Sequence, residues 1–201
     1  MSSSALHEAP AGGSGGRPPH QLLGFARAVD DAFDRVTQAP VWSMTPAEQR
    51  ETAVLLDRLG SRLAELQMRV LVGADRNEVG ADSGATSTAS WLAHATRQTR
   101  ARCSASVRLA TQLDETFPAT RAALGAGRIN PDQARVITDA VNLLTEEYDD
   151  LPPGTHDRAE EHLLDLAAEY DAVTLRRLGK RLFEVVCPEA ADQAEGERLQ
   201  R

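Results

Sequence analysis

Four arginines between residues 97 and 108 have the types and spacing best suited to binding another molecule. They are Arg97, Arg100, Arg102 and Arg108. The planar guanidinium group of arginine donates two parallel hydrogen bonds to a phosphate. No acidic residue lies between positions 86 and 113 to compete for them. We therefore predict that Arg97, Arg100 and Arg108 contact a nucleic-acid backbone, with Arg102 beside them.

The charge distribution supports this prediction more than the total charge does. The chain has 201 residues and a formal net charge of −8. Residues 86–128 carry six arginines against two acids, whereas both flanking segments are acidic. The chain also uses 21 arginines and one lysine, so a second interpretation is that the four arginines only keep an exposed helix soluble. The sequence leaves both interpretations open.

The histidines and acidic residues do not form a pattern typical of an enzyme. The five histidines do not cluster with Cys or Asn as the metal centre of an HNH nuclease requires: His7, His20, His94, His156 and His162. We interpret His156 and His162 as solvent-facing, and also the acids at 146–150 and the pair Glu160 and Glu161. We expect no catalytic residue, no metal site and no cofactor.

The segment LGAGRINPDQARVI, residues 124–137, contains glycines that could belong to a phosphate-binding loop. Such a loop follows a strand, or carries Gly-Lys-Ser/Thr, and neither feature is present. Glycine commonly ends a helix in the left-handed conformation, and Asn130-Pro131 is suited to start the next one. We predict a joint between two helices.

Apolar residues recur at helical spacing along most of the chain, and no segment alternates as a strand would. The predicted fold is all-α, a multi-helix domain with one long N-terminal helix. We expect helices at 22–36, 46–76, 87–96, 100–113, from 118 to 125 or 127, at 131–144, at 155–170, and from 171 or 174 to 186. The helices at 87–96 and 100–113, separated by a break at 97–99, have the outline of a helix-turn-helix.

The helix expected at 46–76 is unusually long. It opens with Thr45-Pro46-Ala47-Glu48, a capping box with proline at the first helical position. At about 1.5 Å per residue it would span roughly 46 Å, more than the width of a small domain. We expect that Gly60 or Gly73 breaks it, or that it packs against a second copy of itself.

Several motifs occur together in one order: WLA at 91–93, the spaced apolar residues 103–113, FPATRAALGAGRI at 117–129 and DQARVI at 132–137. The series continues through apolar positions 159–167 and 175–178. Over roughly residues 45–188 the chain resembles the bacterial domain-of-unknown-function family 222, also called the thirteen-E-twelve repeat family. Members commonly carry a C-terminal HNH endonuclease module, so the resemblance implies work on DNA. This sequence ends before that module would begin, and it has Cys187-Pro188 where the family often has Asp-Pro.

These observations give the following expected organisation. Residues 1–20 form a disordered tail, residues 21–188 the helical domain, and residues 189–201 an extension or a truncated link to a missing HNH module. Two distant cysteines, the absence of a signal sequence and the absence of 18 consecutive apolar residues predict a cytoplasmic protein without a membrane partner. The predicted function is a non-catalytic DNA-associated module whose partner is double-stranded DNA. The alternative is a protein-interaction or homodimerisation module that uses helix 46–76.

Overall fold

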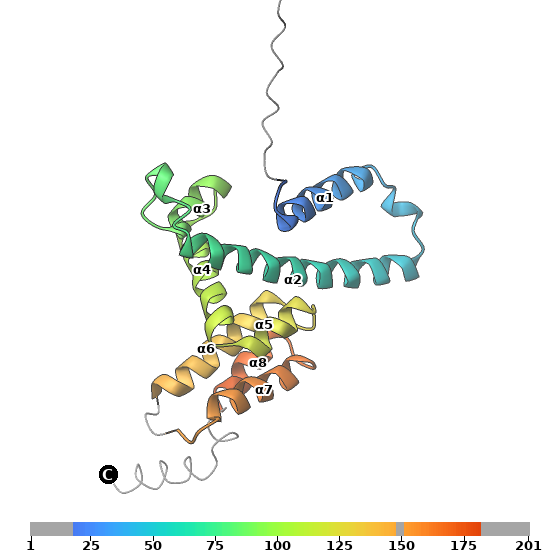
Figure 1. Cartoon of the computed structure of the whole chain (residues 1–201). Coiled ribbons are helices and arrows are strands. Elements are labelled where there is room, and N and C mark those ends of the chain that lie inside the picture. Colours follow the sequence, from blue (N-terminus) through green and yellow to red (C-terminus); the bar gives the residue numbers. More distant parts are fainter. Residues whose placement is uncertain (1–17, 148–150, 182–201) are drawn as a thin grey trace, which may run out of the picture. The chain divides into compact units, whose positions relative to one another are not determined.

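The computed structural model describes residues 18–147 and 151–181, and every regular element in these two ranges is helical (Figure 1). The prediction of an all-α fold is confirmed. The chain divides into two units, Met1–Gln49 and Arg50–Arg201. The expected tail at 1–20 and extension at 189–201 lie almost entirely outside the described residues.

The first unit contains helix α1, Gln21–Val36, which agrees with the helix predicted at 22–36. The Nδ1 atom of His20 caps α1 by accepting a hydrogen bond from the Leu22 N–H at 3.2 Å. None of the α1 residues is buried. A short 3-10 turn, Val41–Ser43, follows before the start of the long helix.

Helix α2, Pro46–Arg76, is continuous over 31 residues. It starts with the predicted capping box, because the Glu48 N–H donates to Thr45 Oγ1 at 3.3 Å and the Thr45 N–H donates to Glu48 Oε2 at 2.7 Å. The expectation that Gly60 or Gly73 breaks the helix is wrong. Glycine costs about 1 kcal/mol relative to alanine in a helix, but it keeps its backbone N–H and C=O, so the hydrogen-bond ladder continues.

The capping box of α2 gives a prediction about pH. Hydrogen bonds from Thr45, first from its backbone N–H and then from its hydroxyl group, lower the pKa of Glu48. A carboxylate with a lowered pKa stabilises the folded state above its unfolded pKa, and this stability is lost as the pH falls through the folded pKa. We expect the first turn of α2 to fray below the usual glutamate range, as followed by the Glu48 amide signal in an NMR pH titration. A Glu48 midpoint at the ordinary glutamate value would contradict this cap.

Up to residue 181, the described part of the second unit continues from α2 with six further helices and a 3-10 turn at Ala81–Ser83. The helices are α3 Thr88–Thr96, α4 Arg100–Glu115, α5 Pro118–Gly125, α6 Pro131–Glu147, α7 Thr155–Ala167 and α8 Ala172–Gly179. The last helix begins after Asp171, whose side chain caps it. The predicted continuation of this helix to residue 186 lies largely outside the described residues.

The main core of the second unit lies among α4, α5, α6, α7 and α8, with α6 packed against both α7 and α8 (Figure 1). Phe117 is completely buried at the start of α5, and the residues around it are almost all aliphatic. The largest of these are Leu109, Leu113, Leu124, Ile137, Leu163 and Leu175. Trp91 is half-buried outside this cluster, and Cys103 is buried.

Candidate functional site

Helices α3 and α4 form the pair that carries the predicted arginines. Ser87 Oγ caps α3 by accepting from the Ser90 N–H at 3.1 Å, and Thr99 Oγ1 caps α4 by accepting from the Arg102 N–H at 3.3 Å. Arg97 ends α3 in the left-handed conformation, with φ of 57°. The turn at 97–99 is therefore specified by the Thr99 cap of α4 and by one residue with positive φ, Arg97.

All four predicted arginines are exposed, and none forms an ion pair with another residue in the described part of the chain. On a helix that turns about 100° per residue, Arg100 and Arg108 lie within about 80° of each other on the outward face of α4. The buried residues Leu109 and Leu113 mark the opposite face. Arg102 lies about 200° from Arg100, so it is on another side of the helix. Arg97 is in the turn itself.

The glycine-containing segment at 124–137 forms the predicted joint between α5 and α6. Gly127 has φ of 69°, its N–H donates to the Leu124 carbonyl at 2.9 Å, and the Arg128 N–H donates to the Ala123 carbonyl at 2.9 Å. Asn130 then caps α6 through reciprocal hydrogen bonds with Gln133 at 2.9 and 3.0 Å. The N–H groups of Gly127 and Arg128 already have partners within the protein, which favours a structural joint over a phosphate cradle.

The joint also lies against α2, which explains its second glycine. A Cβ atom at Gly127 would lie 2.5 Å from Arg58 Cγ and 2.9 Å from the Arg58 carbonyl oxygen. The Arg58 Nε–H donates to the Ala126 carbonyl at 3.3 Å. Residue 127 therefore needs glycine for its backbone conformation and for the close approach of α2.

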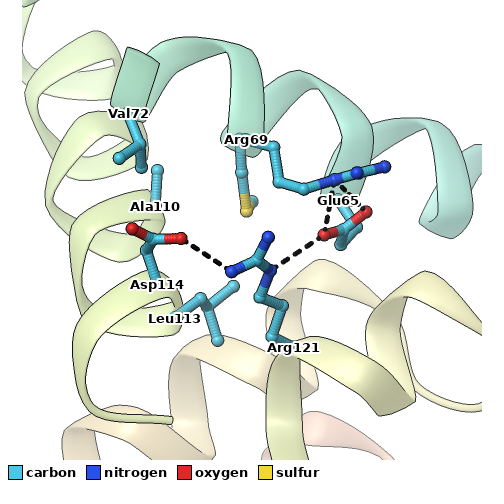
Figure 2. Close-up of a pocket in the computed structure, with 8 residues that line it drawn as sticks. Glu65, Arg69, Val72, Ala110, Leu113, Asp114 and Arg121 are labelled. Atoms are coloured by element: carbon cyan, nitrogen blue, oxygen red, sulfur yellow. Dashed lines mark hydrogen bonds and ion pairs between the residues drawn. The ribbon is translucent and has the colours of Figure 1, made fainter. Parts of the chain in front are cut away.

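A network of ion pairs joins α2 to α4 and α5. Figure 2 shows Arg121 of α5 between two carboxylates: its Nε lies 3.2 Å from Glu65 Oε1, and its Nη1 lies 2.6 Å from Asp114 Oδ1. Arg69 Nε lies 3.0 Å from Glu65 Oε1, and Arg76 Nη2 lies 2.7 Å from Asp114 Oδ2. Each carboxylate thus receives two guanidinium groups.

The pocket around this network is also lined by Met68, Val72, Ala110 and Leu113. Its cavity volume is about 10 Å³, enough for about one water molecule. The network therefore holds helices together and leaves no space for an organic substrate. Sequence analysis missed it, because only the spacing of Glu65 and Arg69 gives a local signal.

The prediction that Glu160 faces solvent is wrong, because its relative exposure is 3%. Glu160 Oε1 accepts a hydrogen bond from the Thr120 N–H at 2.7 Å. Phe117, which precedes α5, provides no side-chain cap. The first N–H groups of a helix need acceptors, and a carboxylate from α7 supplies one within the core. Glu161 is exposed as predicted.

The two histidines of α7 are also less exposed than predicted. His156 and His162 are both half-buried. The ring of His156 lies 4.8 Å from the ring of Phe117, measured between centroids. Burial of the first turn of α7 against α5 accounts for the difference at His156.

The cap supplied by Glu160 has a measurable effect on stability. We expect Glu160→Ala to lower the free energy of unfolding by about 1–3 kcal/mol, because the Thr120 N–H loses its buried acceptor. Glu160→Gln keeps an acceptor oxygen and is expected to lose less. Urea denaturation followed by circular dichroism measures both. Equal losses in the two variants would show that the charge, and not the hydrogen bond, matters.

No group of three or more His, Cys, Asp or Glu residues within 18–147 and 151–181 is placed to hold a metal ion. Part of the acidic segment at 146–150 lies outside these ranges. Within the same part of the chain, no helix combines the length and apolar character needed to cross a membrane.

These features define a helical domain with a basic helix pair and an ion-paired long helix. The model of the family described as domain of unknown function (DUF222) matches residues 46–201. The chain belongs to this family, as its resemblance predicted. No curated protein and no solved structure matches the chain.

Proposed function

We propose that this chain is a non-catalytic, DNA-associated helical module of an HNH-endonuclease-type protein. The observation that carries the proposal is a set of exposed arginines on the α3–α4 pair that form no ion pair within the described residues: Arg97, Arg100, Arg102 and Arg108. Any nuclease chemistry then belongs to a separate HNH module, and this chain positions the DNA.

The local electrostatics of α4 support contact with phosphate. Arg97 and Arg100 flank the start of α4, where the helix dipole adds positive partial charge. Arg108 lies two turns later on the outward face, close enough to follow the same backbone. The first acids of α4 are Asp114 and Glu115 in its last turn, and Asp114 is already paired with arginines.

Titration of a fluorescently labelled duplex tests this proposal directly. Anisotropy is expected to rise to a plateau at low salt, and the affinity is expected to fall at moderate salt because bound phosphates release counterions. The same duplex incubated with the chain and Mg²⁺ is expected to stay intact. No binding at micromolar protein and low salt would overturn DNA association, and cleavage would overturn the non-catalytic assignment.

A specific observation on α2 favours homodimerisation as a second candidate function. Apolar residues follow the alternating spacing of three and four that is typical of a seam between two helices: Leu56, Leu59, Leu63, Leu66 and Val70. Leu66 is half-buried, and the other four residues are exposed. A second copy of the chain offers the identical seam, so a symmetric pairing of α2 with α2 would cover both.

This candidate predicts a mass that increases with concentration. Analytical ultracentrifugation is expected to show a dimer that the Leu59→Glu, Leu63→Glu variant loses. The control variant, Leu143→Glu with Val173→Glu, changes two residues that are also exposed on other helices. A wild-type chain that stays monomeric up to high micromolar concentration would exclude this function.

A further inference from the structure

Helix α2 contains equal numbers of basic and acidic residues, but most of its arginines lie on one side of the helix. Residues 46–76 contain five arginines and five acids, so the composition of the segment gives no sign of a basic surface. The position of each charge around the helix determines which surface it reaches.

Four of these arginines fall on one narrow stripe. At about 100° per residue, Arg58, Arg62, Arg69 and Arg76 lie within about 40° of one another around the α2 axis. They extend over about 27 Å along it. Between Arg58 and Arg76, Glu65 is the acid that shares the stripe, because Asp75 lies about 100° from Arg58. Glu51 lies on the same side of the helix, about two turns before Arg58.

Two further arginines, one on α5 and one in the joint that follows it, lie near the stripe. Arg121 lies against Glu65 in Figure 2. Gly127 lies beside the side chains of α2, since a Cβ there would be 2.5 Å from Arg58 Cγ and 3.3 Å from Arg62 Cγ. Arg128, the next residue, is exposed. We call the complete set the α2 basic band: Arg58, Arg62, Arg69, Arg76, Arg121 and Arg128.

The band carries more positive charge than the ion pairs of the structure neutralise. Glu65 and Asp114 each receive two of its arginines, and together they offset two of the six charges. Arg58, Arg62 and Arg128 form no ion pair within the described residues. Two of the ion-paired arginines, Arg69 and Arg76, are also accessible to solvent, because their side chains are 45% and 63% exposed.

We propose that the α2 basic band is a second contact surface for the sugar–phosphate backbone of duplex DNA. This inference rests on the DNA association proposed above and adds a surface to it. Phosphates of one strand are spaced by about 3.4 Å along the axis of B-DNA. A band of about 27 Å is therefore as long as about eight base pairs of duplex. Glu65 and Asp114 hold Arg69, Arg76 and Arg121 in place, which lowers the entropy cost of ordering them on DNA.

The double variant Arg62→Gln, Arg128→Gln tests the band. Both side chains are exposed and form no ion pair with any residue of the described ranges, so their loss should leave the fold intact. We expect the slope of log K against log salt for a labelled duplex to become shallower by about two, and the affinity at low salt to fall at least about tenfold. The matched control is Arg176→Gln, Arg177→Gln, two exposed arginines on α8. Melting temperatures of all variants establish that they are folded.

A variant at the α3–α4 pair, with Arg97, Arg100, Arg102 and Arg108 replaced by Gln, separates the two proposals. If this variant loses affinity and the Arg62, Arg128 variant binds like its α8 control, the band is overturned and the first proposal stands. If the Arg62, Arg128 variant loses affinity and the other does not, the band holds and the α3–α4 contact fails. A wild-type chain that does not bind duplex overturns both.

Discussion

Replacing Arg121 by alanine is expected to lower the free energy of unfolding of the second unit by about 2–3 kcal/mol. Arg121 lies between Glu65 and Asp114, whose side chains are only 10% and 20% exposed. Its removal leaves each of these carboxylates with one arginine in place of two. A partly buried carboxylate without full compensation is costly, because water cannot replace the lost guanidinium well.

Urea denaturation followed by circular dichroism measures this loss. The neighbouring Arg69→Ala is the matched control, since Arg69 makes one ion pair within a single helix and its side chain is 45% exposed. An i, i+4 ion pair contributes about 0.3–0.5 kcal/mol, so the control should change little. Similar losses in Arg69→Ala and Arg121→Ala would contradict the role of Arg121 in joining α2 to α4 and α5.

Replacing Arg97, Arg100, Arg102 and Arg108 together by glutamine is expected to weaken duplex binding by about two orders of magnitude. Each phosphate contact contributes about 0.9 to the salt slope of B-DNA binding. Because Arg102 lies on another side of α4, the three contacts of Arg97, Arg100 and Arg108 contribute about 2.7. Fluorescence anisotropy at several salt concentrations gives both the affinity and the slope. Glutamine retains much of the side-chain length and removes the charge.

The control for the fourfold variant removes the same charge elsewhere. Arg27, Arg35, Arg176 and Arg177 are exposed and lie on α1 and α8. Replacing these four by glutamine makes the net charge equally more negative, so the general repulsion from DNA is matched. Equal weakening by the two variants would show that overall charge, and not the α3–α4 surface, determines binding.

Much of the fold could be predicted because its helix boundaries have local signals. Thr45 with Glu48, and Asn130 with Gln133, form caps between residues three apart, and Gly127 ends α5 through its own backbone conformation. None of these features needs a distant contact. The family resemblance likewise depends on ordered local motifs, and the match over residues 46–201 confirms it.

The incorrect predictions concern residues whose environment is set by tertiary contacts. Glu160 lies in a polar stretch of sequence, but the packing of α7 on α5 places it at the buried start of α5. Gly60 and Gly73 weaken the helix locally, but α2 remains continuous, and packing buries Glu65, Leu71 and Val72 in its C-terminal half. Local propensity does not include these contacts.

The α2 basic band was missed for a different reason. Segment charge sums average over all sides of a helix, and they give zero for residues 46–76. The spacing of residues 58, 62, 69 and 76 is visible in the sequence. Whether these arginines form a surface, however, depends on which side of α2 packs against other helices. The contacts with Gly127 and Arg121 show that this side borders α5.

The dependence of duplex affinity on salt is the most direct measurement of whether arginine surfaces of this chain bind DNA. For the wild-type chain, log K is expected to fall linearly with log salt, with a slope of about −2.7 or steeper from at least three phosphate contacts. A slope near zero, or no binding at low salt with micromolar protein, would contradict DNA association through these surfaces.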